Sequence, residues 1–456
     1  MVLKSINPTD GTELAAFEEL TPDAIEKALC SAEIASMGWK RSTFEERRAV
    51  LHMIAGILDR DQKALANLMT LEMGKPINQA VAEVQKCALA CRYFADAGEA
   101  LLSDDIVASP PAARIRYLPL GTILAIMPWN FPLWQVFRCL APAIMAGNTM
   151  LLKHASNVPQ CARAIEAVTQ QAGLQPGVFQ NLAIGSARIA NIIRDKRIAA
   201  VTLTGSEAAG AAVARTAGGA LKKCVLELGG NDPFIVLPSA DLEKAIATGV
   251  AARITNNGQS CVCAKRFIVH RDVYDKFEAG FVAAMEALTV GDPMQGSTEL
   301  GPLATAQGLE TLRLQIEQSK SAGARLLTGG RPSGGDGYFY SATVLSDIPR
   351  DAASNDVEMF GPAAALFRAD SFEHAMKLAN DTPYGLGSSV WTNDPVEQQR
   401  CADEIESGQT FINAMVASDP RLPFGGIKLS GYGRELGVHG AREFTNIKTI
   451  VTAAGS

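Results

Sequence analysis

Runs typical of buried strands alternate with runs typical of helices along most of this chain, and this alternation constrains the fold more than any other feature. The first block of expected strands is at 122–127, 149–153, 178–183, 198–203 and 224–228, with helices expected at 133–145, 159–172 and 208–216. Strands joined through helices form a parallel sheet with helices on its faces. We therefore expect an α/β fold.

A second block of the same kind follows the first. Helices are expected at 242–254, 273–287 and 372–379, and strands at 267–270, 364–367 and 390–392. The pair Gly229-Gly230 marks the break between the blocks, and the glycine-rich stretch 329–337 indicates a surface loop. Residues 21–101 are expected to be helical, and the β-branched run 444–452 predicts an exposed strand that needs a partner. With 456 residues, two or three domains are expected.

The composition excludes several classes of protein. A net charge of −6 argues against a nucleic-acid partner, which would require a basic surface. No run of about 18 uncharged apolar residues occurs, so we expect no membrane span. The nine cysteines are an odd, scattered set, which favours a reducing compartment, and the first residues lack the pattern of a signal peptide. We therefore expect a cytoplasmic protein.

The stretch LTGSEAAG is the best candidate for a phosphate-binding turn. No G-x-G-x-x-G motif follows a strand, but Gly205 and Ser206 lie where a predicted strand turns into a helix. Amide groups and a hydroxyl at a helix N-terminus suit a pyrophosphate. An ordinary helix cap is an equally good interpretation of these two residues.

Two polar residues follow or end predicted strands. In MPWNFP, two prolines restrict the backbone around Asn130, whose amide could donate a hydrogen bond to a developing oxyanion or could only cap the next helix. Glu227 ends an apolar strand, where a buried carboxylate is costly unless it is paired or functional. Glu227 is therefore a candidate general base, although most glutamates are simply solvated.

The stretch NNGQSCVCAKR contains two cysteines, Cys261 and Cys263, one residue apart. They could form a metal clip or a disulfide, pack as small core residues, or include a nucleophile. None of the five histidines lies at ligand spacing from this pair, so we expect no metal site. Cys261 follows a turn that contains Gly258, which can place its thiol at a cleft.

Seven motifs occur in an order that resembles the aldehyde dehydrogenase superfamily. They are PWNFP, LTGS, ELGG, GQSC, EMFGP (358–362), NDTPYGL (380–386) and PFGGIKLSGYGRE (423–435). The similarity runs from residue 6 to about residue 449. It implies an α/β fold with a Rossmann-type cofactor-binding domain at 1–107 and 122–229 and an α/β catalytic domain at 230–425. It also implies a small β arm for oligomerisation at 108–121 and 437–456, and hence a homodimer or homotetramer.

The resemblance assigns roles to individual residues. Cys261 matches the nucleophile that attacks an aldehyde carbon, Asn130 matches the oxyanion hole together with the Cys261 N–H, and Glu227 matches the base that activates water. A hydride then passes to a nicotinamide, because an aldehyde carbon has no good hydride to give until a nucleophile makes it tetrahedral. The expected cofactor-binding residues are Trp129, Lys153, Ser156, Gly205, Ser206, Glu358 and Phe360.

Two departures from the common pattern bear on cofactor and substrate. Ser156 stands where the family often has a Glu that holds the adenosine ribose, which removes repulsion toward a 2′-phosphate. We therefore expect NADP⁺ to be preferred over NAD⁺. Arg138 and Ser418 match residues that hold a carboxylate in succinate-semialdehyde dehydrogenases, although a second Arg of that subfamily is replaced here by Thr255.

These matches predict a dehydrogenase of a short ω-carboxylated aldehyde such as succinate semialdehyde. One alternative is a broad aliphatic or aromatic aldehyde dehydrogenase in which Arg138 is incidental and pairs with a surface acid. Another is a non-catalytic protein that shares the fold. Oxidation that closes a Cys261–Cys263 disulfide and reversibly silences the enzyme is a further expectation.

Overall fold

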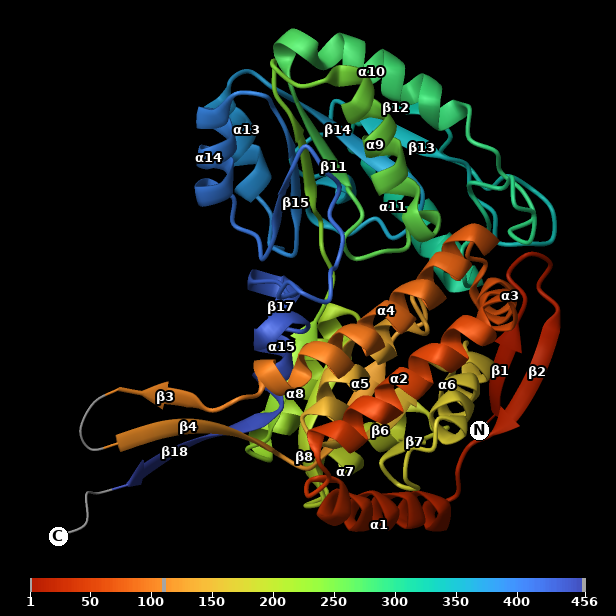
Figure 1. Cartoon of the computed structure of the whole chain (residues 1–456). Coiled ribbons are helices and arrows are strands. Elements are labelled where there is room, and N and C mark those ends of the chain that lie inside the picture. The colour runs from red at the N-terminus through yellow and green to blue at the C-terminus, as the bar shows by residue number, and fades with distance from the viewer. Residues whose placement is uncertain (1, 109–111, 453–456) are drawn as a thin grey trace.

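The computed structural model describes residues 2–108 and 112–452 and consists of two α/β units with an arm that projects from one side (Figure 1). Residues 1, 109–111 and 453–456, which belong to the expected cofactor-binding domain and arm, lie outside the described part. The expected domain boundaries remain a proposal. The chain passes from one large sheet to the other between Glu227 and Pro233.

The first unit is built on a six-stranded sheet. Its order is β17 (Gly431–Tyr432), β9 (Lys223–Glu227), β8 (Ile198–Thr204), β5 (Thr122–Met127), β6 (Thr149–His154) and β7 (Phe179–Asn181). All neighbours are parallel except the short β17, which pairs antiparallel with β9. The chain runs outward from β5 in one direction and then continues from β8 in the other. The carboxyl ends of β5 and β8 therefore flank a topological switch point, where α/β sheets bind ligands.

Helices cover both faces of this sheet. They are α1 (Pro22–Trp39), α2 (Phe44–Arg60), α3 (Gln62–Met73), α4 (Ile77–Leu101), α5 (Trp134–Met145), α6 (Pro159–Gln171), α7 (Ile189–Arg194) and α8 (Glu207–Gly219). Thr43 and Glu46 close a capping box at the start of α2. Every residue of α5 is buried, because α2, α4 and the sheet surround it. Polar side chains on α5 must therefore find partners inside the protein.

The second unit is built on a seven-stranded sheet. Its order is β12 (Arg325–Thr328), β13 (Thr343–Ser346), β14 (Ala363–Ala369), β11 (Arg266–His270), β10 (Pro233–Val236), β15 (Ser388–Trp391) and β16 (Thr410–Ile412). Only β12 is antiparallel to its neighbour. The accompanying helices are α9 (Leu242–Ile254), α10 (Arg271–Glu286), α11 (Ala306–Ser321), α12 (Ala353–Asp356), α13 (Phe372–Asn380) and α14 (Pro395–Glu404). A cluster of stacked and tilted phenylalanines fills the core between β10, β11 and α10.

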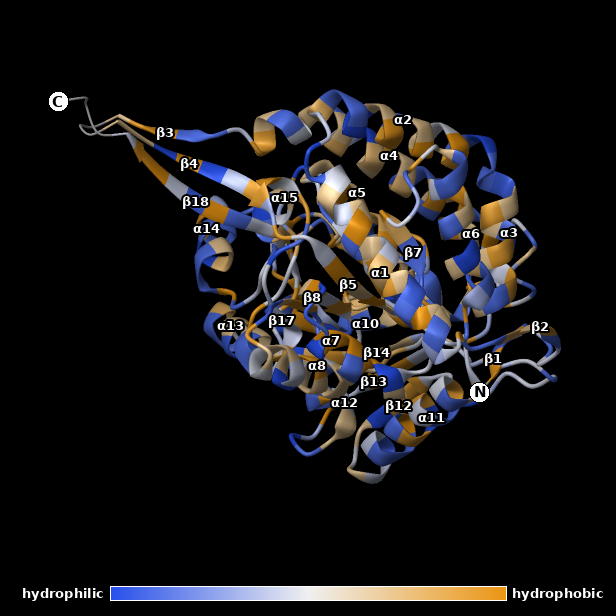
Figure 2. Cartoon of the chain, turned by 90° about the horizontal axis from the view of Figure 1, so that it is seen from below, coloured by the Kyte–Doolittle hydropathy of each residue, from blue (hydrophilic) through white to orange (hydrophobic). Residues whose placement is uncertain are grey.

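The arm is a three-stranded antiparallel sheet of β3 (Asp105–Val107), β4 (Ala112–Pro119) and β18 (Thr445–Thr452). All eight residues of β18 pair with β4, so the expected partner of the C-terminal strand lies in the same chain. β18 is also an edge strand with exposed Ile447 and Val451. Figure 2 shows that hydrophobic and hydrophilic residues are mixed along the strands of the arm. Just before β18, α15 (Gly437–Glu443) packs against α4 and α5, although the expected arm began at residue 437.

The structure contains elements that the sequence pattern did not predict. They are the hairpin of β1 (Val2–Ile6) and β2 (Glu13–Glu18), together with β3, α7, α11, β12, β13, α12, α14, β16, β17 and α15. α11 and α14 are mostly polar, because each presents only a narrow apolar stripe to the protein, and periodicity is weak in such helices. In the described part of the chain, no helix is long and apolar enough to cross a membrane.

Candidate active site

The switch point of the six-stranded sheet opens onto a cavity of about 280 Å³. The turn after β5 contributes Trp129 and Asn130, and the turn after β8 contributes Gly205 and Ser206. Across the cavity lie Cys261, Glu358 and Phe360. The rings of Trp129 and Phe360 meet edge to face, with centroids 5.8 Å apart. Seven of the residues expected from the sequence therefore line one space.

A strained turn precedes Cys261. Asn256 (φ 55°), Asn257 (φ 58°) and Gly258 (φ 74°) are three consecutive residues in the left-handed region, and all three are buried. Asparagine tolerates this conformation better than most residues, although the strain has an energetic cost. A Cβ at position 258 would collide with the carbonyl of Gly361, so only glycine fits there.

Side-chain amides hold this turn in place. The Asn256 amide donates to the carbonyl of Asn130 at 2.6 Å and to that of Gln259 at 3.0 Å. The Asn257 amide donates to the carbonyls of Gly74 at 2.8 Å and Pro302 at 2.9 Å. These bonds tie the turn before Cys261 to the turn after β5, so the thiol and Asn130 are positioned together.

Arg253 also supports this turn. It lies two residues before the position at which the subfamily often has a second Arg. Its guanidinium is fully buried and donates to the carbonyl of Gly258 at 2.6 Å. Through this bond, Arg253 stabilises the conformation of the turn that precedes Cys261.

The Cys261 thiol is protonated in the free protein. Burial raises its pKa to about 12, and the nearby charges of Arg138 and Lys265 oppose that effect. The buried ammonium of Lys265 donates to the carbonyl of Cys261 at 2.7 Å and pairs with Glu358 at 2.9 Å. The nucleophile must therefore lose its proton during the reaction.

Asn130 is placed to donate to an oxygen next to Cys261. The side chain is buried, and one N–H of its amide donates to the carbonyl of Gln259 at 3.1 Å, which leaves the other N–H for a ligand. Among the described residues, no protein group accepts a hydrogen bond from the Cys261 N–H. Two free donors beside a nucleophile are what an oxyanion hole requires. Asn130 does not cap α5, because the N–H groups of Leu133 and Trp134 at the start of that helix donate to the carboxylate of Glu83 at 2.9 Å.

Glu227 ends β9 and is buried, with no hydrogen-bond partner for either carboxylate oxygen within the described residues. Burial raises its pKa well above the ordinary value. The charge of Arg138 lowers this pKa, and that of Glu435 raises it further. A Cβ on Gly425 would lie 2.7 Å from one of these oxygens, so the glycine of the PFGG motif leaves room for the carboxylate. Glu227 is therefore not a solvated surface acid.

The position of Arg138 differs from the expectation of a guanidinium free to bind a substrate. Its Nε forms a fully buried ion pair with Glu435, and Nη2 donates to the Thr204 hydroxyl at 3.4 Å. The guanidinium also lies over the ring of Phe424, 4.5 Å from its centroid. Because α5 is buried on all sides, an arginine there requires an internal counter-charge. Glu435 lies in the GRE sequence of the last motif, where a buried partner of Arg138 could have been sought.

Ser418 has a partner that the sequence reasoning missed. Lys86 on α4 donates to the Ser418 hydroxyl at 2.7 Å, and its ammonium lies 4.6 Å from the ring centroid of Trp134. The only hint in the sequence was that Lys86 lies among the apolar residues that α4 turns toward the core. Long-range contacts of this kind cannot be read from spacing along one helix.

The residues expected at the adenosine end lie at the end of β6. Lys153 is 8% exposed and has no ion-pair partner among the described residues, and Ser156 is exposed two residues after the strand. Burial lowers the pKa of Lys153, while the charge of Glu19 opposes that effect. A buried cation without a partner, next to an exposed hydroxyl, fits an anionic group such as a 2′-phosphate. Ser206 also caps α8 by accepting from the Ala209 N–H at 3.4 Å.

His154, which the sequence left without a role, is a structural link. One ring nitrogen donates to the carbonyl of Pro132 at 2.8 Å, and the other accepts from the Ala155 N–H at 2.8 Å. Burial lowers its pKa to about 4, so the ring is neutral. The bond to Pro132 holds the turn that carries Asn130 against the end of β6.

Cys263 is buried and faces away from the cavity. Its thiol donates to the carbonyl of Thr255 at 3.4 Å and does not line the cavity. All nine cysteines are free in the structure, and a disulfide between Cys261 and Cys263 remains a prediction. Across the described ranges, no cluster of three or more His, Cys, Asp or Glu side chains could hold a metal ion.

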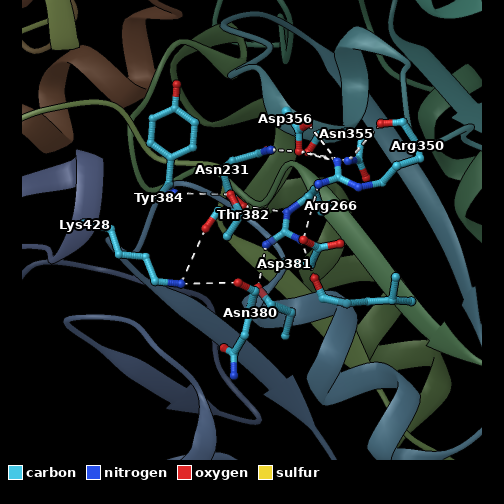
Figure 3. A network of polar contacts seen from close by, with 12 residues as sticks. Asn231, Arg266, Arg350, Asn355, Asp356, Asn380, Asp381, Thr382, Tyr384 and Lys428 are labelled. Carbon is cyan, nitrogen blue, oxygen red and sulfur yellow. Dashed lines mark hydrogen bonds and ion pairs between the residues drawn. The ribbon is translucent and has the colours of Figure 1, made fainter.

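The NDTPYGL motif has a structural role beside the site (Figure 3). Arg266 donates to the carbonyls of Asn231, Leu378 and Ala379 at 2.6–2.9 Å, and burial lowers its pKa to about 10. Lys428 donates to the carbonyls of Asn380 and Thr382 at 3.2 Å and 3.4 Å. These bonds connect the start of β11 to the end of α13, and the segment before Gly431 to the start of the motif. The Ser430 hydroxyl accepts from the Gly385 N–H at 3.0 Å and donates to the Gly229 carbonyl at 2.7 Å, which links the motif to the segment that follows Glu227.

Comparisons with known proteins identify the family to which the chain is similar. The profile of the Aldehyde dehydrogenase family matches residues 1–450. The chain is 50% identical over 454 residues to "Succinate-semialdehyde dehydrogenase [NADP(+)] 1" of Mycobacterium bovis (strain BCG / Pasteur 1173P2), covering 99% of both chains. It is 48% identical to "Succinate-semialdehyde dehydrogenase [NADP(+)]" of Mycobacterium leprae, again over 99% of both chains.

A solved structure is also similar to this chain over nearly its whole length. It is succinic semialdehyde dehydrogenase from Streptococcus pyogenes in complex with NADP⁺, which is 37% identical to this chain with a TM-score of 0.97. The match covers 99% of this chain and 100% of the solved one. The expected α/β fold with a Rossmann-type sheet is confirmed. The chain belongs to the aldehyde dehydrogenase family.

Proposed function

We propose that this protein oxidises succinate semialdehyde to succinate with NADP⁺ as the preferred acceptor. The observation that carries the proposal is that Cys261 and Asn130 line the cavity at the switch point, and that the buried Glu227 lies close enough to Cys261 for its charge to affect the thiol. A thiol, a free amide donor and a buried carboxyl are the groups needed to make and then hydrolyse a thioester. The named relatives support the substrate and the cofactor.

The reaction begins at Cys261. Its thiol gives its proton to water, and the thiolate forms a bond to the aldehyde carbon, so that the carbonyl oxygen becomes an oxyanion. The Asn130 amide and the Cys261 N–H donate to that oxygen and stabilise its charge. When bound, NADP⁺ supplies the hydride acceptor that the oxidation requires. The acyl group then remains on Cys261 as a thioester.

Glu227 serves the second half of the reaction. As a carboxylate it accepts a proton from water, and the hydroxide formed attacks the thioester carbon. The carbon–sulfur bond breaks, the acid leaves, and Cys261 is regenerated. The raised pKa of Glu227 makes the carboxylate a stronger base than an exposed glutamate. Arg138 holds Glu435 and keeps a positive charge near Glu227.

The cofactor-binding residues are those whose positions suit an anionic dinucleotide: the end of β6, the start of α8 and the wall of the cavity. Lys153 and Ser156 would hold the 2′-phosphate of NADP⁺, and Gly205 and Ser206 would hold the pyrophosphate at the start of α8. Trp129, Glu358 and Phe360 would border the nicotinamide half. NAD⁺ remains usable because the contacts to the pyrophosphate and to the nicotinamide half do not require the 2′-phosphate.

The assembly and location are proposals as well. The exposed edge of β18, with Ile447 and Val451, would pair with another copy of the chain to give a homodimer or homotetramer. No nucleic-acid or membrane partner is proposed. The cytoplasmic location expected from the cysteine usage stays a prediction.

Steady-state production of NADPH tests this function. The wild type should form NADPH from succinate semialdehyde, and Cys261→Ala should abolish it while the protein still binds NADP⁺ in a fluorescence titration. A wild type that oxidises butanal as efficiently as succinate semialdehyde would favour the broad-specificity alternative. A wild type with no activity toward any aldehyde would favour a non-catalytic protein.

A further inference from the structure

The proposed substrate carries a carboxylate, and the site contains two cations that could bind it. Arg138 on α5 and Lys86 on α4 lie near each other, since the charge of Arg138 lowers the pKa of Lys86. The guanidinium of Arg138 is already neutralised by Glu435. Binding a second carboxylate there would bring two buried negative charges together, which is unfavourable.

Lys86 is in the opposite situation. Within residues 2–108 and 112–452, no carboxylate lies within ion-pair distance of its ammonium. The nearest acid of the facing loop, Asp419, is held by Arg421 through two hydrogen bonds of 2.6 Å and 2.9 Å. Burial, together with the nearby charge of Arg138, lowers the pKa of Lys86 to about 8. A half-buried ammonium that lacks a counter-charge favours an anionic ligand.

The surroundings of Lys86 suit a small carboxylate. The ammonium donates to Ser418, whose own hydroxyl proton remains available for an acceptor. Trp134 provides an apolar wall on α5, 4.6 Å from the ammonium. Lysine and serine together can donate to both oxygens of one carboxylate.

The group also lies on the part of α5 that leads to Arg138, a neighbour of the reacting thiol. Trp134 and Arg138 are one helical turn apart on α5, and Arg138 lies close enough to Cys261 and Glu227 for their charges to affect one another. The segment that begins at Ser418 reaches Glu227 through Gly425. We propose that Lys86, with Ser418, binds the carboxylate of the substrate and sets the preference for a semialdehyde acid. This inference rests on the proposed function.

Paired kinetics with succinate semialdehyde and butanal, which has the same chain length and no carboxylate, test the inference. Lys86→Met should lower kcat/KM for succinate semialdehyde roughly 10- to 100-fold, mainly through KM, because a charge-assisted hydrogen bond is lost. It should leave butanal within about twofold. Lys86→Arg keeps the cation and should retain part of the preference. Arg92→Met is the matched control, because it removes one charge from an exposed site on the same helix.

The pH dependence gives a second readout. Lys86 faces Arg138 on α5, Glu83 and Cys87 on α4, and Asp419 on the facing loop. The ammonium of Lys86 should lose its proton as the pH rises through about 8. The KM for succinate semialdehyde should then rise about tenfold per pH unit, because the cation is lost. The KM for butanal should not follow, and Lys86→Met should remove the difference.

The outcomes separate this inference from the proposed function. If the wild type does not prefer succinate semialdehyde over butanal, the proposed substrate is wrong and the inference falls with it. If the wild type shows the preference and Lys86→Met keeps it, only the inference is overturned. Equal losses for both substrates in Lys86→Met would show a structural role and would also overturn it.

Discussion

Arg138 on α5 and Glu435 in the segment after β17 form an ion pair with almost no solvent exposure, next to the buried carboxyl of Glu227. The pair lies between the helix that follows Asn130 and the segment that carries Gly425. It therefore couples two parts of the site that are about 300 residues apart in sequence. The charges of this pair act on Glu227: Arg138 lowers the pKa of its carboxyl, and Glu435 raises it.

Arg138→Met should destabilise the protein by about 3–5 kcal/mol, because it leaves Glu435 buried without a counter-charge. The double variant Arg138→Met with Glu435→Gln should recover much of that loss, since no unpaired charge then remains. Thermal melting and urea unfolding of the three proteins measure the effect. A single variant as stable as the wild type would mean that Glu435 is protonated or solvated in the folded protein.

The same variant bears on substrate binding. Because Glu435 occupies the guanidinium, we expect Arg138→Met to reduce kcat for succinate semialdehyde and butanal to a similar extent. The loss of its positive charge would raise the pKa of Glu227 and of Cys261 for either substrate. A KM effect confined to the semialdehyde would instead restore Arg138 as the carboxylate-binding residue.

The raised pKa of Cys261 predicts slow alkylation of the free enzyme at neutral pH. Only the thiolate reacts with iodoacetamide, so the rate at Cys261 should rise about tenfold per pH unit and should not level off below pH 10. The expected pKa of about 12 sets that range. Mass spectrometry of the Cys261 peptide follows the reaction, with buried Cys401 as an internal control. A plateau near pH 8 would mean that nearby charges outweigh the burial.

Much of the fold could be predicted from the sequence because the buried parallel strands have an unambiguous pattern. β5, β6 and β8 are continuous apolar runs bounded by turns, and each is found within one residue of its expected bounds. β12 and β16 are short and only partly buried, so their residues carry little periodic signal. The polar helices α11 and α14 were missed for the same reason.

Some residues of the candidate site could also be recognised from the sequence, and others could not. Cys261, Asn130 and Glu227 occur at turns and strand ends within motifs, and such positions can be recognised along the chain. Lys86 and Glu435 act through partners 332 and about 300 residues away, at distances set by the packing of α4 and α5. The sequence left open whether Arg138 faces a substrate or a protein carboxylate, because that choice depends on the packing.

If β18 forms the interface between copies of the chain, a substitution in this strand should disrupt the oligomer without changing the active site. Ile447→Lys places a charge among the exposed apolar residues of β18 and should shift the protein toward a smaller species. Asn446→Lys adds the same charge on the opposite face of the strand and serves as the control. Light scattering coupled to size exclusion measures the mass of each. If both variants keep the mass of the wild type, β18 does not form the interface.

Ser156 predicts the direction of cofactor choice. Ser156→Glu introduces a carboxylate two residues after β6, near the free ammonium of Lys153. A carboxylate there would repel a 2′-phosphate and accept hydrogen bonds from a free ribose hydroxyl. The ratio of kcat/KM for NADP⁺ over NAD⁺ should fall by roughly 100-fold, which corresponds to about 2.7 kcal/mol.

Ser156→Ala separates loss of the hydroxyl from gain of the charge. It should reduce the NADP⁺ preference only several-fold, since one neutral donor is lost while Lys153 remains. Lys153→Met removes the cation itself and should weaken NADP⁺ binding more than NAD⁺ binding in a direct titration. If Ser156→Glu leaves the ratio unchanged, the 2′-phosphate is bound elsewhere. Arg163, close to the same strand end and stacked on Phe17, would then be the next residue to replace.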